Sequence, residues 1–201
     1  MRLLAYLPDL TMLTILADRL ITCYFPSKIR ERIAPPELGE ELIPPGVQSS
    51  VFNGFVTSSN NENGLKLKIH HDKKGGVSCR WTVARAFEGY PQTLHGGVSF
   101  AILDELLAYS VFDRYRTFAV TLSSKTQWLG RIKVDSDITA KAVVTRKFWR
   151  FVRVEGMIFN NKGRVVVKMH GTFYMPTKSE FKKLIDLSIM PSESLPYCGT
   201  D

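Results

Sequence analysis

The chain has 201 residues, enough for one full domain with extensions, and its 44% hydrophobic and 23% charged residues are typical of a globular protein. Its net charge of +8 favours anionic partners such as acidic lipid headgroups or phosphate-bearing small molecules. Long blocks of like charge are absent, which argues against a nucleic-acid-binding tail, and we expect no nucleic-acid partner.

The cysteines and histidines do not form a metal-binding pattern. Cys23, Cys79 and Cys198 are far apart and include no CxxC pair, which argues against a zinc site and a disulfide framework. His70 and His71 are adjacent and would point to opposite faces of a strand. We therefore expect no metal, no bound cofactor, and a reducing, cytoplasmic compartment.

The N-terminus is apolar but interrupted by charge. Asp9, Asp18 and Arg19 break the apolar run of residues 1–25, whereas a spanning helix needs roughly 20 mostly apolar residues. The same charges disagree with a secretory signal or a transit peptide. We predict no integral membrane segment, and an amphipathic helix over residues 10–32 that packs on the body or lies on a membrane surface.

Proline-rich sequence and then strand-like alternation follow. Four prolines within residues 34–46 predict a linker or an extended wrap. Residues 50–58, 65–71 and 77–87 read as strands, separated by the turn signals NNENG and KKGG. A polar loop, EGYPQTLHGG, then leads into residues 98–112, which are apolar on nearly every side and predict an enclosed helix.

The C-terminal half reads as strands. They are predicted at residues 118–128, 136–148, 151–159 and 164–175, with NNKG as a hairpin turn between the last two. KSEFKKLIDLS predicts a short terminal helix. One apolar helix followed by a run of strands predicts an α+β fold, with an antiparallel sheet curled around the helix. We divide the chain into an N-terminal extension (1–46), a central domain (47–176) and a C-terminal tail (177–201).

Chemistry concentrates in the stretch TLHGGVSFAILDELLAYSVF. Gly96 and Gly97 stand just before the helix, where free amides and the helix dipole suit an oxyanion or a thioester carbonyl; a plain tight turn is the alternative. Asp104 shares a helix face with apolar and small residues, so an ionised carboxylate there is costly unless paired, hydrated or functional. Glu105 projects about 100° away, and either carboxylate could instead reach solvent or pair with an arginine.

Spacing limits how the glycines and the aspartate could cooperate. Asp104 lies eight residues beyond Gly96, or roughly 12 Å along one helix. Both groups act on one carbonyl only if a second copy of the helix runs antiparallel beside the first. If both are catalytic, the sequence predicts a two-fold dimer with two composite sites.

HGGVSFAILDE resembles the signature of the hotdog-fold acyl-CoA thioesterases, particularly the group related to the phenylacetate-pathway thioesterase PaaI and the human thioesterase-superfamily members. In that group HGG precedes the central helix and an aspartate follows nine residues after the histidine, as His95 and Asp104 do. The likeness covers residues 77–175. It implies a hotdog fold, here with an N-terminal helical extension, and a homodimer or homotetramer.

The resemblance also implies roles for residues. The Gly96 amide would polarise the thioester carbonyl, with Gly97 beside it, and Asp104 of the partner subunit would act as general base or nucleophile. His95 would shape the loop and bond substrate or the carbonyl oxygen. The hydroxyl that positions the water would be Thr121, with Ser123 as second choice.

Two positions depart from the family pattern. Gly89 stands where an asparagine or glutamine is common, with Gln92 or Glu88 as candidate replacements, and Arg131 stands where a proline is common. The basic cluster of Arg146, Lys147, Arg150 and Arg153 would meet coenzyme A phosphates or form a solvated hairpin edge. We expect Trp128, Phe148 and Trp149 in the core or an interface.

The predicted activity is hydrolysis of acyl-CoA to a carboxylate and free coenzyme A. The rival prediction is a non-catalytic hotdog module that binds acyl-CoA, lipid or a protein partner, which the basic N-terminus and Gly89 favour. A dehydratase acting on acyl thioesters is a third candidate, but its branch usually has a proline-rich loop that TLHGGVSF does not match.

Overall fold

The computed structural model describes residues 35–45 and 52–184. Contacts divide the chain into two units, Met1–Ala34 and Pro35–Asp201, and all described residues belong to the second. The helix predicted over residues 10–32 lies outside the described residues. Neither described helix is long and apolar enough to cross a membrane.

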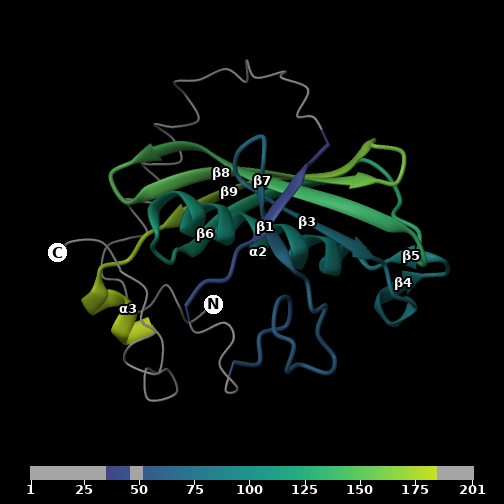
Figure 1. Ribbon diagram of the computed structural model, residues 1–201, viewed down its shortest axis with the longest axis horizontal. Helices are drawn as coiled ribbons and strands as arrows, with labels where there is room; N and C mark the ends of the chain where they lie inside the picture. Colours follow the sequence, from purple (N-terminus) through teal and green to yellow (C-terminus); the bar gives the residue numbers. More distant parts are fainter. Residues whose placement is uncertain (1–34, 46–51, 185–201) are drawn as a thin grey trace. The chain divides into compact units, whose positions relative to one another are not determined.

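A seven-stranded antiparallel sheet covers one long helix (Figure 1). The strand order is β1-β2-β3-β7-β8-β9-β6, so β1 and β6 are the edges. The strands are β1 (Leu38–Glu41), β2 (Ile69–Asp72), β3 (Val77–Thr82), β6 (Val120–Trp128), β7 (Asp137–Phe148), β8 (Phe151–Asn160) and β9 (Val165–Tyr174). The other elements are η2 (Arg85–Phe87), the small ladder of β4 (Glu88–Tyr90) and β5 (Thr93–Leu94), α2 (Gly96–Tyr115) and α3 (Lys178–Leu184). The predicted antiparallel sheet around one central helix is confirmed.

The helix α2 is enclosed because its apolar side chains cover most of its circumference. It contacts β2, β3 and β6–β9, and Leu103 and Leu107 are fully buried. Gly156 on β8 and Gly171 on β9 let it approach closely, since an added Cβ would come within 3.1 Å of Leu103 and 3.3 Å of Leu107 respectively. The helix ends at Tyr115, and the next residue, Arg116, caps it with a left-handed backbone (φ 54°). The backbone N–H of Arg116 donates to the Phe112 carbonyl.

The strand predicted at residues 50–58 is wrong for the part that the structure describes, residues 52–58, where the backbone is irregular and turns at residues 55–57. The Ser58 hydroxyl donates to the Phe52 carbonyl at 2.7 Å and accepts the Asn60 N–H at 3.1 Å. These side-chain bonds give the backbone an alternative to a strand ladder. Residues 65–69 alternate between buried and exposed, as the sequence pattern predicted. Of the segment 65–71, only residues 69–71, which belong to β2, join the sheet.

Two other segments differ from the prediction in detail. The proline-rich segment is not a plain linker, because β1 lies within it and pairs antiparallel with β2, as the wrap alternative requires. The strand predicted over residues 77–87 ends at Thr82, and η2 then turns the chain so that Phe87 packs on Trp81 at 5.6 Å.

Candidate active site

His95 caps the N-terminus of α2. Its ring Nδ1 accepts a hydrogen bond from the backbone N–H of Gly97 at 2.9 Å. The backbone N–H of His95 donates to the carbonyl of Phe87 at 2.9 Å. Because Nδ1 is the acceptor, the ring proton of the neutral imidazole lies on Nε2. The exposed side chain of His95 can therefore offer an N–H to a ligand at the start of the helix.

The two glycine amides differ. The Gly97 N–H is engaged by His95, whereas the N–H of Gly96 has no protein acceptor among the described residues. A Cβ at Gly96 would make ordinary contact with Trp128, at 3.4 Å from Nε1, so packing within the described chain does not demand glycine there. A half-buried glycine at a helix N-terminus, whose amide has no acceptor among the described residues, suits a ligand oxygen.

Asp104 lies half-buried on α2 and is held by the edge strand. The hydroxyl of Thr121 on β6 donates to Asp104 Oδ1 at 2.9 Å. Burial raises the pKa of Asp104 above its usual 3.8, and the Thr121 hydrogen bond opposes that rise. A carboxylate that favours taking up a proton, beside a hydroxyl that can orient water, is suited to general-base chemistry.

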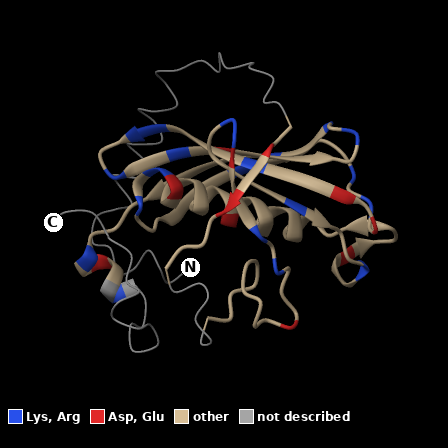
Figure 2. Cartoon of the chain, viewed as in Figure 1, with Lys and Arg blue, Asp and Glu red and all other residues tan. Residues whose placement is uncertain are grey.

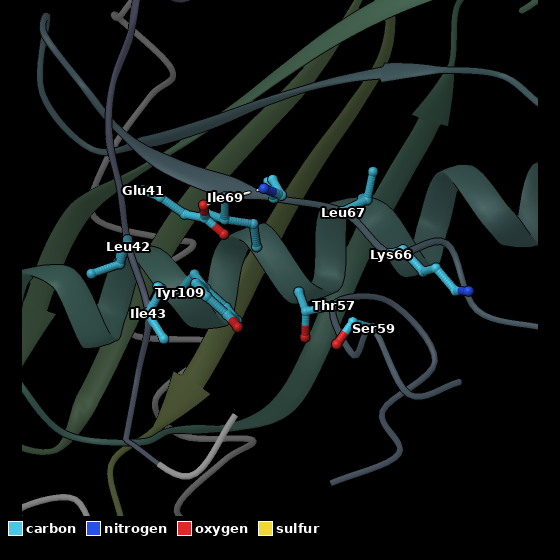
Figure 3. A pocket seen from close by; sticks show the side chains of 10 residues that line it. Glu41, Leu42, Ile43, Thr57, Ser59, Lys66, Leu67, Ile69 and Tyr109 are labelled. Carbon is cyan, nitrogen blue, oxygen red and sulfur yellow. Dashed lines mark ion pairs between the residues drawn. The ribbon is translucent and has the colours of Figure 1, made fainter. Parts of the chain in front are cut away.

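Glu105, the next residue, has a different hydrogen-bond partner from Asp104. The hydroxyl of Thr57 donates to Glu105 Oε1 at 3.1 Å, and burial raises the pKa of Glu105, with Asp104 adding to the rise. Burial also raises the pKa of Tyr109 to about 12. Thr57 and Tyr109 line a pocket of about 560 Å³ (Figure 3). Its other lining residues are Glu41, Leu42, Ile43, Ser59, Lys66, Leu67, Lys68 and Ile69.

The loop before the helix explains the Gly89 departure in steric terms. A Cβ at Gly89 would lie 2.9 Å from His95 Cα and 3.0 Å from its ring, so no side chain fits without displacing His95. Gln92 is exposed with a left-handed backbone (φ 61°), and its N–H donates to the Glu88 carboxylate. Glu88 thus holds the loop, while the side chain of Gln92 is open to solvent.

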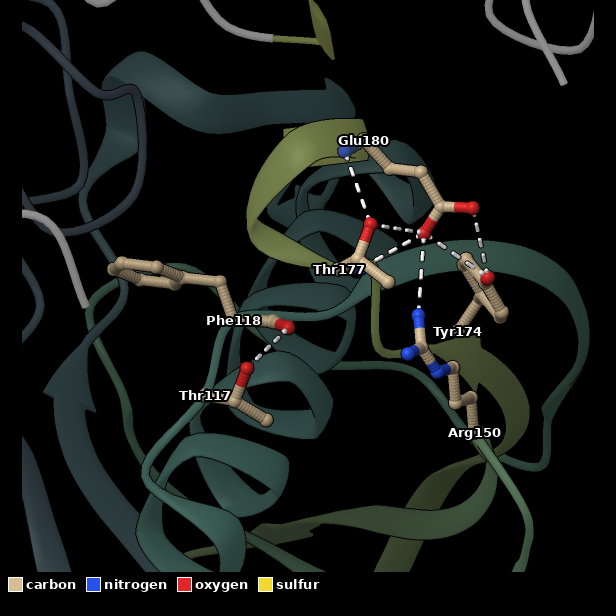
Figure 4. A network of polar contacts seen from close by, with 6 residues as sticks. All are labelled: Thr117, Phe118, Arg150, Tyr174, Thr177 and Glu180. Carbon is tan, nitrogen blue, oxygen red and sulfur yellow. Dashed lines mark hydrogen bonds and ion pairs between the residues drawn. The ribbon is translucent and has the colours of Figure 1, made fainter. Parts of the chain in front are cut away.

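The remaining predicted site residues are spread over the sheet. Ser123 is half-buried on β6, just past a register shift that follows Thr121. Arg146 is exposed near the end of β7, and Arg150 pairs with Glu180 of α3 at 3.4 Å (Figure 4). Arg131 is exposed after β6.

The protomer thus holds two separate groups of predicted site residues. His95, Gly96 and Gly97 start the helix, and Asp104 with Thr121 lies roughly 12 Å further along it. Arg146 and Arg150 lie near the far end of α2, where Lys147 contacts the ring of Tyr115 at 4.7 Å.

Sequence reasoning missed Thr57, which is 48 positions from Glu105 in an irregular segment without any motif. It expected Trp128 in the core or an interface and did not connect it with Gly96, and Trp128 is 52% exposed.

The described His, Cys, Asp and Glu residues meet the requirements of neither a metal site nor a reactive thiol. No cluster of three or more His, Cys, Asp or Glu side chains forms a metal site there. Cys79 is buried and unpaired, and burial raises its thiol pKa to about 12, which leaves it unreactive.

Residues 91–167 match the family model of the thioesterase superfamily. Among solved structures, a thioesterase superfamily protein shares 20% identity with a TM-score of 0.57, covering 86% of this chain and 83% of that one. Zebra fish thioesterase superfamily member 2 shares 18% identity with a TM-score of 0.54, covering 60% and 90%. The E. coli PaaI protein from the phenylacetic acid degradation operon shares 20% identity with a TM-score of 0.51, covering 55% and 79%. No curated protein sequence matches the chain. These structures establish the hotdog fold, and together with the family model they confirm the resemblance to the hotdog-fold thioesterases of the PaaI-like group.

Proposed function

We propose that the protein hydrolyses acyl-CoA thioesters to a carboxylic acid and free coenzyme A. One observation carries the proposal: a half-buried aspartate on the central helix accepts a hydrogen bond from a threonine of the edge strand, within a thioesterase-superfamily fold. Burial favours the protonated form of this carboxyl group, and a base that activates water must accept a proton.

In the proposed reaction, Asp104 takes a proton from water held by Thr121, and the water oxygen attacks the thioester carbonyl carbon. The carbonyl oxygen becomes an oxyanion that Gly96 N–H and the Nε2–H of His95 stabilise. Collapse breaks the carbon–sulfur bond, and the departing thiolate recovers the proton from Asp104. The alternative in which Asp104 attacks the carbonyl itself uses the same residues and ends in hydrolysis of an anhydride.

The proposed site needs two protomers. Within one chain Gly96 and Asp104 are roughly 12 Å apart along the helix, too far to act on one carbonyl. Strand β6, which carries Thr121, is an edge of the sheet and leaves one row of backbone groups without a strand partner among the described residues. Two-fold pairing of β6 with its copy would set the two helices head to tail and bring Gly96 of one protomer towards Asp104 of the other.

Four further residues are proposed to contact substrate. Gln92 and Ser123 flank the catalytic groups on the loop and on β6. Arg146 and Arg150 lie at the C-terminal end of α2, so they would meet coenzyme A phosphates only on a substrate bound at the partner's Gly96. This part of the proposal predicts a raised KM, with little change in kcat, when either arginine is replaced.

A binding module without turnover is the second candidate. The observation that favours it is Gly89, where the family commonly has an amide side chain and where the contact with His95 leaves no room for one. Saturable acyl-CoA binding without thiol release from any acyl chain length would support this candidate.

Complementation between two inactive variants tests the composite site. Asp104→Asn removes the base. Gly96→Pro replaces the amide hydrogen with a ring carbon and should leave the helix intact, because proline suits the first helical position and His95 before it is already extended, at ψ 133°. Each variant alone should release little thiol from acyl-CoA. Mixed and reassembled in equal amounts, they should regain about a quarter of wild-type activity, since half the dimers carry one intact site.

The outcomes separate the candidates. No recovery on mixing, from variants that remain folded and exchange subunits, would rule out a site shared between protomers. Full activity in Asp104→Asn alone would remove the aspartate from the mechanism.

A further inference from the structure

The hairpin that joins β7 and β8 concentrates positive charge. Its sequence VVTRKFWRFVRV contains Arg146, Lys147, Arg150 and Arg153 and no carboxylate. Arg146 and Arg153 are register partners across the two strands, and like charges placed opposite each other destabilise a sheet. Figure 2 shows basic segments on both strands near this turn, at the left of the view. This end of the sheet is therefore suited to an anionic partner.

The tip of the same hairpin is aromatic and exposed. Phe148 is 65% and Trp149 is 60% exposed, and they are consecutive. Trp149 begins the two-residue turn with a left-handed backbone (φ 51°), a conformation that glycine or asparagine adopts more easily. The turn therefore gains nothing in backbone energy from a tryptophan, and both side chains are more than half exposed.

The base of the tip is held in place. The Trp149 ring packs against Phe151 at 5.9 Å and Tyr174 at 6.4 Å, and the Arg150 guanidinium lies 5.4 Å from its centroid. Glu180 of α3 fixes Arg150 and accepts the hydroxyl of Tyr174, as Figure 4 shows. The tip is thus presented on a supported base.

We propose that the β7–β8 hairpin docks on an anionic membrane surface, with Phe148 and Trp149 entering the headgroup region and Arg146 and Lys147 lying against lipid phosphates. Tryptophan is enriched at membrane interfaces because its ring is apolar and its N–H is polar. Anionic leaflets attract clustered Lys and Arg. A soluble phosphate compound would use the cations but give the exposed Phe148 no role. This inference does not depend on thioester hydrolysis, and for Arg146 it competes with the proposed contact to coenzyme A phosphates, which the variants below distinguish.

Vesicle binding by the full chain tests the aromatic tip. The wild type should co-sediment with phosphatidylcholine vesicles that contain phosphatidylserine and only weakly with pure phosphatidylcholine. Phe148→Ser combined with Trp149→Gly should weaken this binding at least tenfold. Glycine suits the left-handed position, and a melting curve verifies that the variant is folded. Of the three tryptophans, Trp149 should account for the blue shift in fluorescence on vesicle addition.

A pair of charge-matched variants tests the cations. Arg146→Ala with Lys147→Ala should weaken binding roughly 30-fold, as two surface cations near an anionic leaflet do. Lys162→Ala with Arg164→Ala removes the same charge at the β8–β9 turn and should change binding little. Equal losses in the two double variants would overturn the proposal, because attraction by net charge alone would then explain binding.

Other occupants of the hairpin give distinct results. If the arginine–lysine variant raises the KM for acyl-CoA while vesicle binding is unchanged, the hairpin belongs to the substrate site and the membrane proposal is wrong. If the aromatic variant changes the oligomer size and leaves vesicle binding intact, the tip is a contact between copies of the chain, and the proposal is likewise wrong.

Discussion

Two neighbouring carboxylates of α2 face different surroundings. Asp104 and Glu105 are consecutive, both are half-buried, both accept a hydrogen bond from a threonine, and burial raises the pKa of both. Asp104 meets Thr121 on the edge strand β6, whereas Glu105 meets Thr57 in the irregular segment before β2.

The difference shows that burial and a raised pKa do not by themselves identify a catalytic base. By those measures Glu105 qualifies as well as Asp104. What distinguishes Asp104 is its position at the edge strand, where a second protomer could bring a helix N-terminus to it. Glu105 instead accepts a hydrogen bond from Thr57, which lines the pocket of Figure 3 together with Tyr109 and residues 41–43 and 66–69.

The largest expected effect separates the two acids by turnover. Asp104→Asn should lower kcat for acyl-CoA hydrolysis at least about 100-fold, because general-base catalysis contributes that much or more. The matched Glu105→Gln should lower it less than about fivefold, because that carboxylate serves packing and a hydrogen bond. Thiol release under saturating substrate measures both. A comparable loss in the two variants would mean that the helix needs both charges and that the comparison fails.

A smaller effect concerns the two threonines. Thr121→Val should lower kcat/KM roughly tenfold, the usual scale for a hydrogen bond to a charged group. Because the Thr121 bond opposes the rise in the pKa of Asp104, its loss should raise that pKa further and move the acid limb of the pH–rate profile to higher pH.

Thr57→Val is the control, since it removes the corresponding bond to Glu105. It should leave the acid limb in place. An acid limb that moves in Thr57→Val but not in Thr121→Val would assign the base to Glu105.

The helix and strands that were predicted correctly are those whose hydrophobic pattern is visible within the segment itself. Strands β6 to β9 and the helix α2 appear where alternation and an apolar run predicted them, because burial in this fold follows those patterns. Residues 52–58 belong to a segment that was also predicted as a strand, but the side chains of Ser58 and Asn60 donate to the backbone carbonyl of Phe52 and favour an irregular turn. Strand β1 was missed as a strand because four residues carry little pattern and its pairing depends on β2, about thirty positions away.

The candidate site was visible in the sequence as an anomaly. A carboxylate within an apolar helix indicated Asp104, and the family resemblance suggested Thr121, whose hydrogen bond to Asp104 is now observed. The catalytic roles stay predictions. Thr57 could not be found, because its contact with Glu105 joins an irregular segment to the helix and no spacing rule connects them.

The smallest expected effect is on stability, and it concerns both acids. Since burial raises their pKa values above the usual 3.8 and 4.5, the folded state binds these protons more tightly than the unfolded state does. Ionisation therefore lowers the free energy of unfolding as pH rises from the usual values through the raised ones. Asp104→Asn and Glu105→Gln should each raise the free energy of unfolding at neutral pH, and the gain should vanish at pH values below 3.8, where the carboxyls are protonated in both states. Urea denaturation at the two pH values measures this.

Asp137→Asn is the control, because Asp137 also accepts a threonine hydroxyl, that of Thr82 at 2.6 Å, but is exposed and should gain nothing. A gain for Glu105→Gln alone would mean that Asp104 is already hydrated in the free protein, and the access of water that catalysis requires would then exist before substrate binds.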